Sequence, residues 1–161
     1  MGILDTRDLN KRLNELEDER EDLEDAVTIL KDELNDCDPD EKEDYENNVV
    51  DAIEALNEWD DEYKEELDEL YTMRDEISEW QHGETLIAEE DFAEYAEQLA
   101  DDLYGVKHHW PFNHIDWDAA ADELQPDYFT VDYQGTTYLY RGVKYGWTST
   151  DRARRVLHSV P

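Results

Sequence analysis

Residues 9–34 read LNKRLNELEDEREDLEDAVTILKDEL, and they carry the strongest structural pattern in the sequence. Leucines occupy every seventh position: Leu9, Leu16, Leu23 and Leu30. A second apolar series lies between them: Leu13, Val27 and Leu34. Only Arg20 interrupts this second series. Such a heptad repeat predicts a helix, over about residues 8–35, that pairs with another helix along its apolar seam.

A second heptad series predicts the partner helix. It comprises Val49, Leu56, Tyr63, Leu70 and Ile77, with Ala52, Trp59, Met73 and Trp80 three positions later. Glu66 is the one misfit, and Leu67 beside it is expected to turn inward. Asp38 suits an N-cap, Pro39 the first helical position and Glu41 a capping box. We therefore expect a helix over about 40–80 and an antiparallel coiled-coil hairpin.

This second helix should be the longer of the two. At ~1.5 Å per residue, residues 8–35 span roughly 40 Å and residues 40–80 roughly 60 Å. The excess needs a surface to pack on, so we expect a homodimer held by the second helix and the C-terminal domain.

The chain from residue 83 to 141 predicts a small α+β domain. Acids at 89–91 favour a helix start, and Gly105 is placed to close that helix. Its apolar face is Phe92, Tyr95, Ala96, Leu99 and Leu103. After a loop over 106–114, a short helix is expected over about 117–124, capped by Asp116 or a neighbour. The β-rich runs 128–133 and 136–141 flank Gln134-Gly135, which predicts a two-residue β-hairpin.

The fold class is therefore mainly α with a small α+β part. The expected domains are an acidic hairpin over 1–82, a small domain over 83–141, and a weakly ordered basic tail over 142–161. That tail contains Lys144, Arg152, Arg154 and Arg155 against Asp151 alone.

Charge limits the classes of function. The 161 residues carry 47 Asp and Glu against 14 Lys and Arg, a net charge of −33. Residues 1–80 alone hold 32 acids against 8 basic residues. Such a field repels nucleic acid and anionic membranes, so direct binding to either is not expected. The single Cys37 and the acidic start without an apolar run predict a cytoplasmic protein, in the host cytoplasm if a phage encodes it.

Acidic clusters on the predicted helices are the candidate partner-binding residues. They are Glu17, Asp18, Glu21, Asp22, Glu24, Asp25, Asp60, Asp61, Glu62, Glu65, Glu66, Asp68 and Glu69. Carboxylates three or four residues apart lie ~5–6 Å apart on a helix, close to the phosphate spacing of a DNA strand. A protein that binds DNA through Lys and Arg can accept such a surface. Adaptation to high salt, which the six lysines suit, and an ordinary solvated coiled coil are the alternatives.

Other chemistry is poorly supported. His108, His109, His114, Asp116 and Asp118 lie within eleven residues, but their spacing matches no standard zinc pattern, and loop hydrogen bonding is favoured. No nucleophile–base–acid set or phosphate-binding loop is recognisable. The sequence predicts a non-enzymatic protein without cofactor or metal.

The segment from Phe92 to Arg141 resembles the C-terminal part of the ArdA antirestriction family and related small phage proteins. Three stretches carry the resemblance: YAEQLADDL at 95–103, Ile115-Asp116-Trp117, and AADEL at 120–124, which ends at Leu124. The β-hairpin follows. The family has Arg where this chain has Asp122, and its N-terminal domains are replaced here by the acidic hairpin. The resemblance implies an elongated, dimeric DNA mimic that inhibits type I restriction-modification enzymes.

The resulting expectation is a non-enzymatic DNA mimic that inhibits a host defence complex of the antirestriction or anti-CRISPR type. Its partner would be a DNA-binding protein with a basic cleft. The alternative is a coiled-coil adaptor whose C-terminal domain binds a protein, its acidity reflecting halophilic adaptation.

Overall fold

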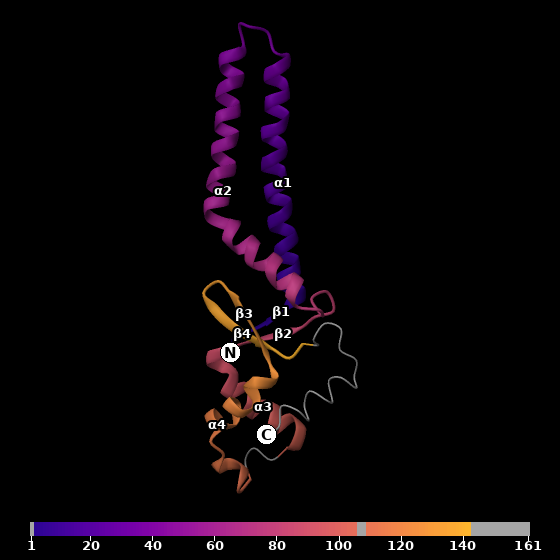
Figure 1. The fold of residues 1–161 in the computed structure, drawn as a ribbon, viewed down its shortest axis with the longest axis vertical. Coiled ribbons are helices and arrows are strands. Elements are labelled where there is room, and N and C mark those ends of the chain that lie inside the picture. The colour runs from indigo at the N-terminus through magenta and orange to yellow at the C-terminus, as the bar shows by residue number, and fades with distance from the viewer. Residues whose placement is uncertain (1, 106–108, 143–161) are drawn as a thin grey trace. The chain divides into compact units, whose positions relative to one another are not determined.

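The chain is mainly helical, with two long helices and a small four-stranded antiparallel sheet (Figure 1). A computed structural model describes residues 2–105 and 109–142. The helices are α1 (Thr6–Asp36), α2 (Lys42–Glu76), α3 (Phe92–Tyr104) and α4 (Trp117–Leu124). The strands are β1 (Ile3–Asp5), β2 (Thr85–Ala88), β3 (Phe129–Tyr133) and β4 (Thr136–Tyr140). Three short 3₁₀ turns complete the list: η1 (Glu89–Asp91), η2 (Phe112–His114) and η3 (Gln125–Asp127).

Two compact units divide the chain. The helical unit is Leu9–Thr72, and the sheet unit combines Met1–Asp8 with Met73–Pro161. This division differs from the expected boundary at residue 82, because the first eight residues and the end of α2 belong with the sheet. The predicted tail from residue 143 onward lies outside the described residues.

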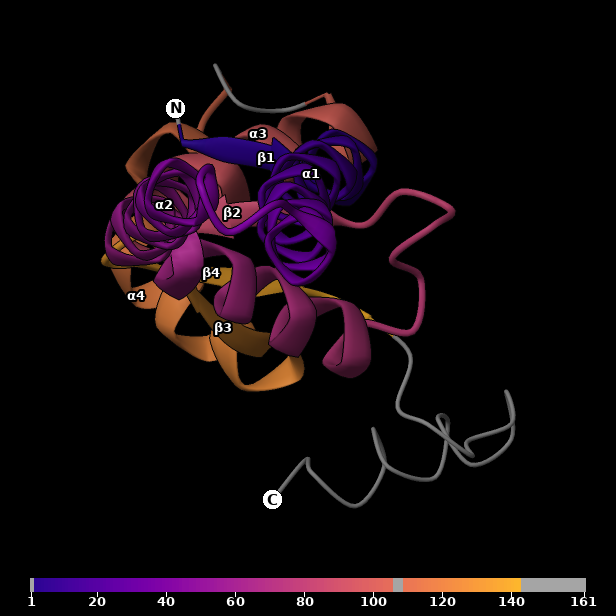
Figure 2. The same ribbon diagram turned by 90° about the horizontal axis from the view of Figure 1, so that it is seen from above.

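In the helical unit, α1 and α2 run side by side in opposite directions (Figures 1 and 2). Arg12 bonds to Glu66, while Arg20, farther along α1, bonds to the earlier Asp60 of α2. Near these two ion pairs, apolar residues of both helices are buried: Leu13 and Leu16 of α1, and Trp59, Leu67 and Leu70 of α2. The inward turn of Leu67 beside Glu66 is thus confirmed.

The bounds of α2 differ from those predicted. It begins at Lys42, because residues 39–41 form a turn in which the Glu41 N–H donates to the Asp38 carbonyl, so Asp38 is not the N-cap. It ends at Glu76 rather than near Trp80. The two long helices therefore contain 31 and 35 residues, and the predicted overhang of the second helix is nearly absent.

The sheet has strand order β1-β2-β4-β3, and every neighbouring pair is antiparallel. The predicted hairpin forms its β3–β4 half, with Gln134 and Gly135 both at positive φ. Sequence reasoning missed β1 and β2. These strands contain three and four residues and pair across more than 80 positions, Ile3 with Ile87, so neither shows a recognisable alternation.

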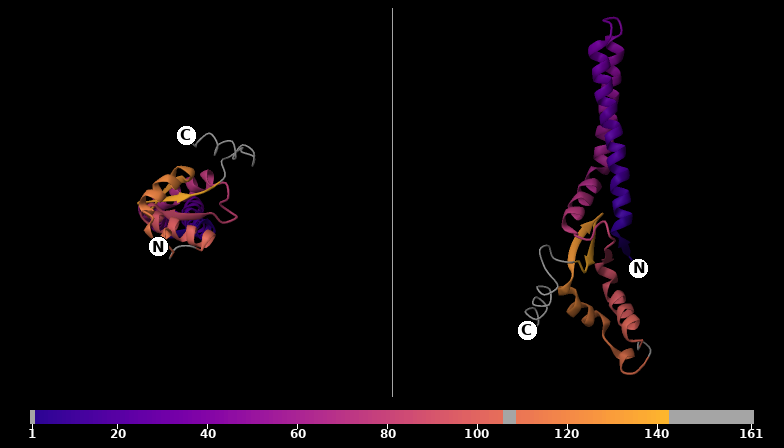
Figure 3. Two further views of the ribbon diagram at one scale, coloured as in Figure 1. Left: turned by 90° about the horizontal axis from the view of Figure 1, so that it is seen from below. Right: turned by 90° about the vertical axis from the view of Figure 1, so that its right-hand side faces the viewer.

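One face of the sheet packs against α3 and α4 (Figure 3, right). Ile87 and Leu139 of the sheet join Phe92, Ala96 and Ala121 of the helices in a buried cluster. The predicted face of α3 is correct except at Leu103, whose exposure is 65 % because it lies beyond the edge of this core. Gly105 closes α3 in the left-handed conformation, as predicted.

Thr6 fastens the start of α1 to the segment before β2. Its hydroxyl donates to the Trp80 carbonyl at 2.8 Å and accepts from the Glu84 N–H at 2.8 Å. The Thr6 N–H donates to the Glu84 carbonyl at 3.0 Å. Thr6 is fully buried, so these bonds satisfy polar groups that water does not reach. Within the described part of the chain, no helix is long and apolar enough to cross a membrane.

Candidate acidic interaction surface

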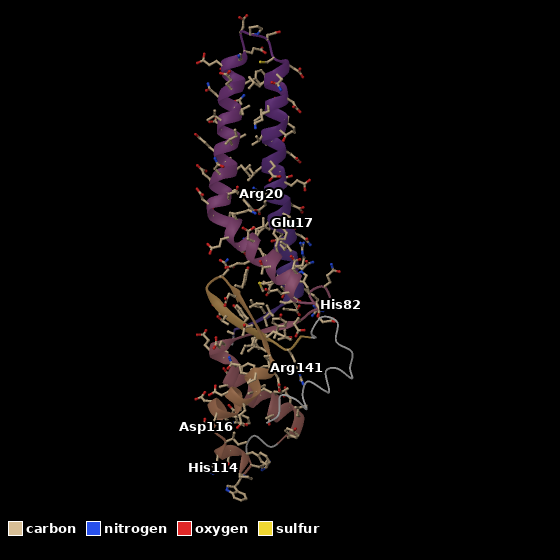
Figure 4. All side chains as sticks on the ribbon, viewed as in Figure 1. Glu17, Arg20, His82, His114, Asp116 and Arg141 are labelled. Atoms are coloured by element: carbon tan, nitrogen blue, oxygen red, sulfur yellow. The ribbon has the colours of Figure 1, made fainter. Side chains whose placement is uncertain are left out.

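The helical unit concentrates the negative charge of the chain. Between residues 9 and 72 the sequence holds 27 Asp and Glu against 6 Lys and Arg, a net charge of −21. Figure 4 shows carboxylate oxygens along the outer sides of both long helices. Because the seam takes the apolar residues, the acids occupy the positions that heptad spacing turns outward.

The structure exposes most of the predicted partner-binding acids. The exposed ones are Asp18, Glu21, Asp22, Glu24 and Asp25 of α1 and Asp61, Glu62, Glu65 and Asp68 of α2. Four others are half-buried: Glu17, Asp60, Glu66 and Glu69. The predicted set therefore divides into a solvated group and a group closer to the seam.

Two arginines engage part of the predicted set inside the helix pair. Arg20 forms a forked pair with both carboxylate oxygens of Asp60, at 2.9 and 3.2 Å, and also bonds to Glu24. The Arg20 guanidinium lowers the pKa of Asp60 below its usual value, chiefly through these hydrogen bonds. Arg12 forms a similar fork with Glu66, at 3.0 and 3.2 Å. Asp60 and Glu66 thus hold the helices together and are poorly placed to meet a partner.

The outer face of α2 carries a longer acidic row than the sequence analysis identified. Six exposed acids follow one another at spacings of three or four residues: Asp51, Glu54, Glu58, Asp61, Glu65 and Asp68. We call this set the α2 stripe. Lys64 pairs with Asp68 at 2.8 Å, whereas the other five form no ion pair among the described residues. The signal was present in the heptad numbering, because these acids fill the two positions farthest from the seam.

A shallow hollow lies on another side of the pair. Its volume is about 430 Å³, and its lining comprises Glu17, Arg20, Glu21, Glu24, Asp25, Lys64, Leu67 and Tyr71. Figure 4 labels Glu17 and Arg20 on this part of α1. Arg20 and Lys64 offset two of the four carboxylates there, so the hollow has a weaker field than the α2 stripe.

The residues of the family-like motif have structural positions in the sheet unit. The Asp116 carboxylate caps α4 by accepting from the Ala119 N–H at 3.2 Å. Leu124 packs against the buried cluster, Trp117 is half-buried, and Ile115 is exposed. Among the described residues no group of three His, Cys, Asp or Glu side chains could hold a metal ion, and His108 lies outside them.

No protein family, curated protein or solved structure matches this chain.

Proposed function

We propose that this protein is a non-enzymatic DNA mimic that occupies the basic cleft of a DNA-binding defence complex, of the restriction-modification or CRISPR type. The α2 stripe, on one of two long helices that run side by side, is the observation that supports the proposal. It offers a row of solvated carboxylates at regular spacing along a helix, which is the arrangement that a phosphate-binding surface accepts.

Charge density supports the comparison with DNA. A pair of helices of about 30 residues is roughly 45 Å long at ~1.5 Å per residue. A net charge of −21 over this length corresponds to one charge per ~2 Å, against one per ~1.7 Å for duplex DNA. The pair is also about as wide as a duplex, since two helices of ~10 Å lie side by side.

The mechanism is competition for the cleft. Lys and Arg side chains of the target would exchange their counterions for the carboxylates of the helical unit, as they do for phosphates. Each contact is modest and screened, so affinity is distributed over many acids rather than held by one residue. In this proposal the protein acts in the cytoplasm. A homodimer would double the acidic surface available to a target.

Displacement of DNA tests this function. Purified DNA-binding defence complexes, a type I restriction-modification enzyme among them, are loaded with fluorescent duplex and titrated with the full chain. We expect the chain to release the duplex from at least one complex, and excess duplex to reverse the effect. Failure to release duplex from any complex at protein concentrations up to ~100 µM and 0.05 M salt would contradict the proposal.

A protein adaptor is the second candidate. It is favoured by exposed apolar side chains in the sheet unit, Trp110 at 79 % and Tyr104 at 72 %. In this alternative the acidic helices serve as a solvated arm, and their charge reflects adaptation to salt. Substitutions in the sheet unit, rather than in the α2 stripe, would then abolish activity.

A further inference from the structure

The end of the sheet unit, where α3 stops and the chain returns to α4, has an unusual surface. Five large apolar side chains are exposed there: Leu103 (65 %), Tyr104 (72 %), Trp110 (79 %), Phe112 (40 %) and Ile115 (38 %). We call this set the aromatic end. The His109 carbonyl accepts from the Asn113 N–H and the Pro111 carbonyl from the His114 N–H, which folds this segment into a compact turn beside η2. Figure 4 labels His114 and Asp116 at this end.

The aromatic end is poor in carboxylates, although exposed Asp102 and Asp116 flank it in sequence. Residues 103–115 contain no Asp or Glu, although the chain has 47 in 161 residues. Most of the remaining surface would bring like charges together if two copies approached. At 0.15 M salt, repulsion between exposed charges extends over about 8 Å, so a surface with few carboxylates is the least costly place for two copies to meet.

The exposed area fits a weak dimer. Taking ~200 Å² for a fully exposed aromatic side chain, the five residues present on the order of 500 Å² of mostly apolar surface. A summed exposed apolar area of this size is at the upper end of what monomers expose. Two copies would bury roughly 1,000 Å² in total, which is at the lower limit for a specific interface.

Other surfaces suit self-association less well. The outer strands of the sheet, β1 and β3, carry Asp5 and Asp132, and charges on an edge strand oppose strand pairing between copies. Ile29 and Val50 are exposed on the long helices, but acids lie three or four residues away from each on the same helix, Asp25, Asp32 and Glu33 around Ile29 and Glu46 and Glu54 around Val50.

We infer that the aromatic end is a self-association surface, through which two copies of this chain form a weak two-fold dimer. The inference rests on the homodimer of the proposed function, but not on DNA mimicry. Because the same surface of each copy faces the other across the two-fold axis, association stops at the dimer and does not continue into longer oligomers. Interfaces at the lower size limit are typical of weak, transient complexes, so we expect a dissociation constant on the order of micromolar.

Sedimentation equilibrium of the full chain from about 1 to 500 µM tests the inference. We expect the mass to rise from 19.1 kDa toward twice that value. Trp110→Ser should weaken association at least ~10-fold, because exposed aromatic residues at the centre of an interface contribute most to binding. Tyr104→Glu should weaken it further by adding like charge. Both residues are exposed, so circular dichroism melts should match those of the unsubstituted chain.

Matched controls lie on the long helices. Ile29→Ser and Ile29→Glu make the same kinds of change at a residue that is 56 % exposed, and they should leave the dimer intact. Raising salt from 0.02 to 0.15 M should strengthen the dimer by screening repulsion. A mass of 19.1 kDa at every concentration, or a dimer that survives both aromatic-end variants, would overturn the inference. Oligomers that dissociate as the salt concentration rises would also overturn the inference, because such a response indicates that one copy binds the acidic helices of another through opposite charges.

The duplex-displacement assay separates this inference from the proposed function. Trp110→Ser should still release duplex, although at a higher concentration of protein. If the chain dimerises through the aromatic end but does not displace DNA, the self-association surface is supported and the proposed DNA mimicry is contradicted. A monomeric chain whose protein partner is lost on Trp110→Ser would instead support the adaptor.

Discussion

Thr6 shows how one polar side chain organises a junction between distant segments. Its hydroxyl serves both the Trp80 carbonyl and the Glu84 N–H, and its own N–H reaches the Glu84 carbonyl. Valine has nearly the same shape but neither donates nor accepts. Residue 6 was not singled out by the sequence, because a buried threonine has no signature without its partners.

We expect Thr6→Val to destabilise the sheet unit by about 2 kcal/mol, since the buried Trp80 carbonyl and the part-buried Glu84 N–H lose their partner. Urea unfolding followed by the fluorescence of buried Trp80 measures the change. Thr130→Val is the matched control, because Thr130 of β3 is exposed, and it should change stability by less than ~0.5 kcal/mol. Equal effects of the two substitutions would contradict the role of Thr6.

Glu84 gives the sheet unit a specific dependence on pH. Partial burial raises the pKa of its carboxyl above the usual value, although backbone N–H groups of Thr85, Arg141 and Gly142 oppose the shift. A carboxyl with a raised pKa in the folded state binds protons more readily there than in the unfolded chain. Its contribution to stability therefore increases as pH falls from neutral toward about 4, near its unfolded value.

The Glu84→Gln variant should lack this contribution. We expect the unsubstituted chain to gain stability relative to the variant between pH 7 and pH 4.5, as measured by urea unfolding at each pH. Glu90→Gln, at an exposed carboxyl next to η1, serves as the control and should follow the unsubstituted chain. A constant difference between chain and variant across this range would refute the assignment.

At the scale of elements, Arg20 acts as a register marker in the α1–α2 pair. It interrupts an otherwise apolar series, and its fork with Asp60 fixes which turns of the helices lie opposite each other. A double-mutant cycle with Arg20→Ala and Asp60→Ala should give a coupling of roughly 0.5–2 kcal/mol in thermal or urea unfolding. The exposed pair Lys64–Asp68 is the control, with a coupling of at most ~0.5 kcal/mol. A coupling energy near zero between Arg20 and Asp60 would contradict the proposed role of this ion pair in setting the register of the two helices.

Elements with a long periodic signal were predictable from the sequence. The seam placed both long helices, and Asp116, Gly105 and Gln134-Gly135 placed a cap, a helix end and a turn. The strands β1 and β2 were not predictable, because a strand of three or four residues acquires its identity from a partner far away in sequence. The start of α2 was misplaced because the Asp38-Pro39 signal is equally compatible with a turn.

The acidic surface was predictable in kind but only partly in detail. Composition indicated carboxylates on solvated helix faces, and most of the predicted residues are exposed. Asp60 and Glu66 could not be separated from the rest, because their arginine partners lie 40 and 54 positions away. Asp51, Glu54 and Glu58 were missed because acids spaced three or four apart are less conspicuous than consecutive ones.

At the scale of the whole molecule, the net charge of −33 sets the response to salt. Self-repulsion opposes the folded state, and salt relieves it until the Debye length falls to about 8 Å at 0.15 M. We expect the melting temperature to rise steeply up to ~0.15 M NaCl and then to level off. Thermal melts from 0.01 to 3 M NaCl test this. A melting temperature that continues to rise into the molar range would favour adaptation to high salt.

The most direct test of the central claim compares two variants of equal charge in the duplex-displacement assay. The first neutralises the α2 stripe, with Asp51, Asp61 and Asp68 changed to Asn and Glu54, Glu58 and Glu65 changed to Gln. The second neutralises six exposed acids of the sheet unit in the same way: Glu89, Glu90, Glu94, Asp122, Glu123 and Asp127. Net charge changes equally in both, so only position differs.

We expect the stripe variant to lose affinity at least ~100-fold at 0.05 M salt and to show a shallower dependence on salt, because several charge contacts are removed. The sheet-unit variant should remain within ~5-fold of the unsubstituted chain, since in the proposed mechanism the target contacts the carboxylates of the helical unit and not those of the sheet unit. Equal loss in both variants would mean that overall charge, not the α2 stripe, drives binding. Loss in the sheet-unit variant alone would contradict the DNA mimic and place the binding surface on the small domain.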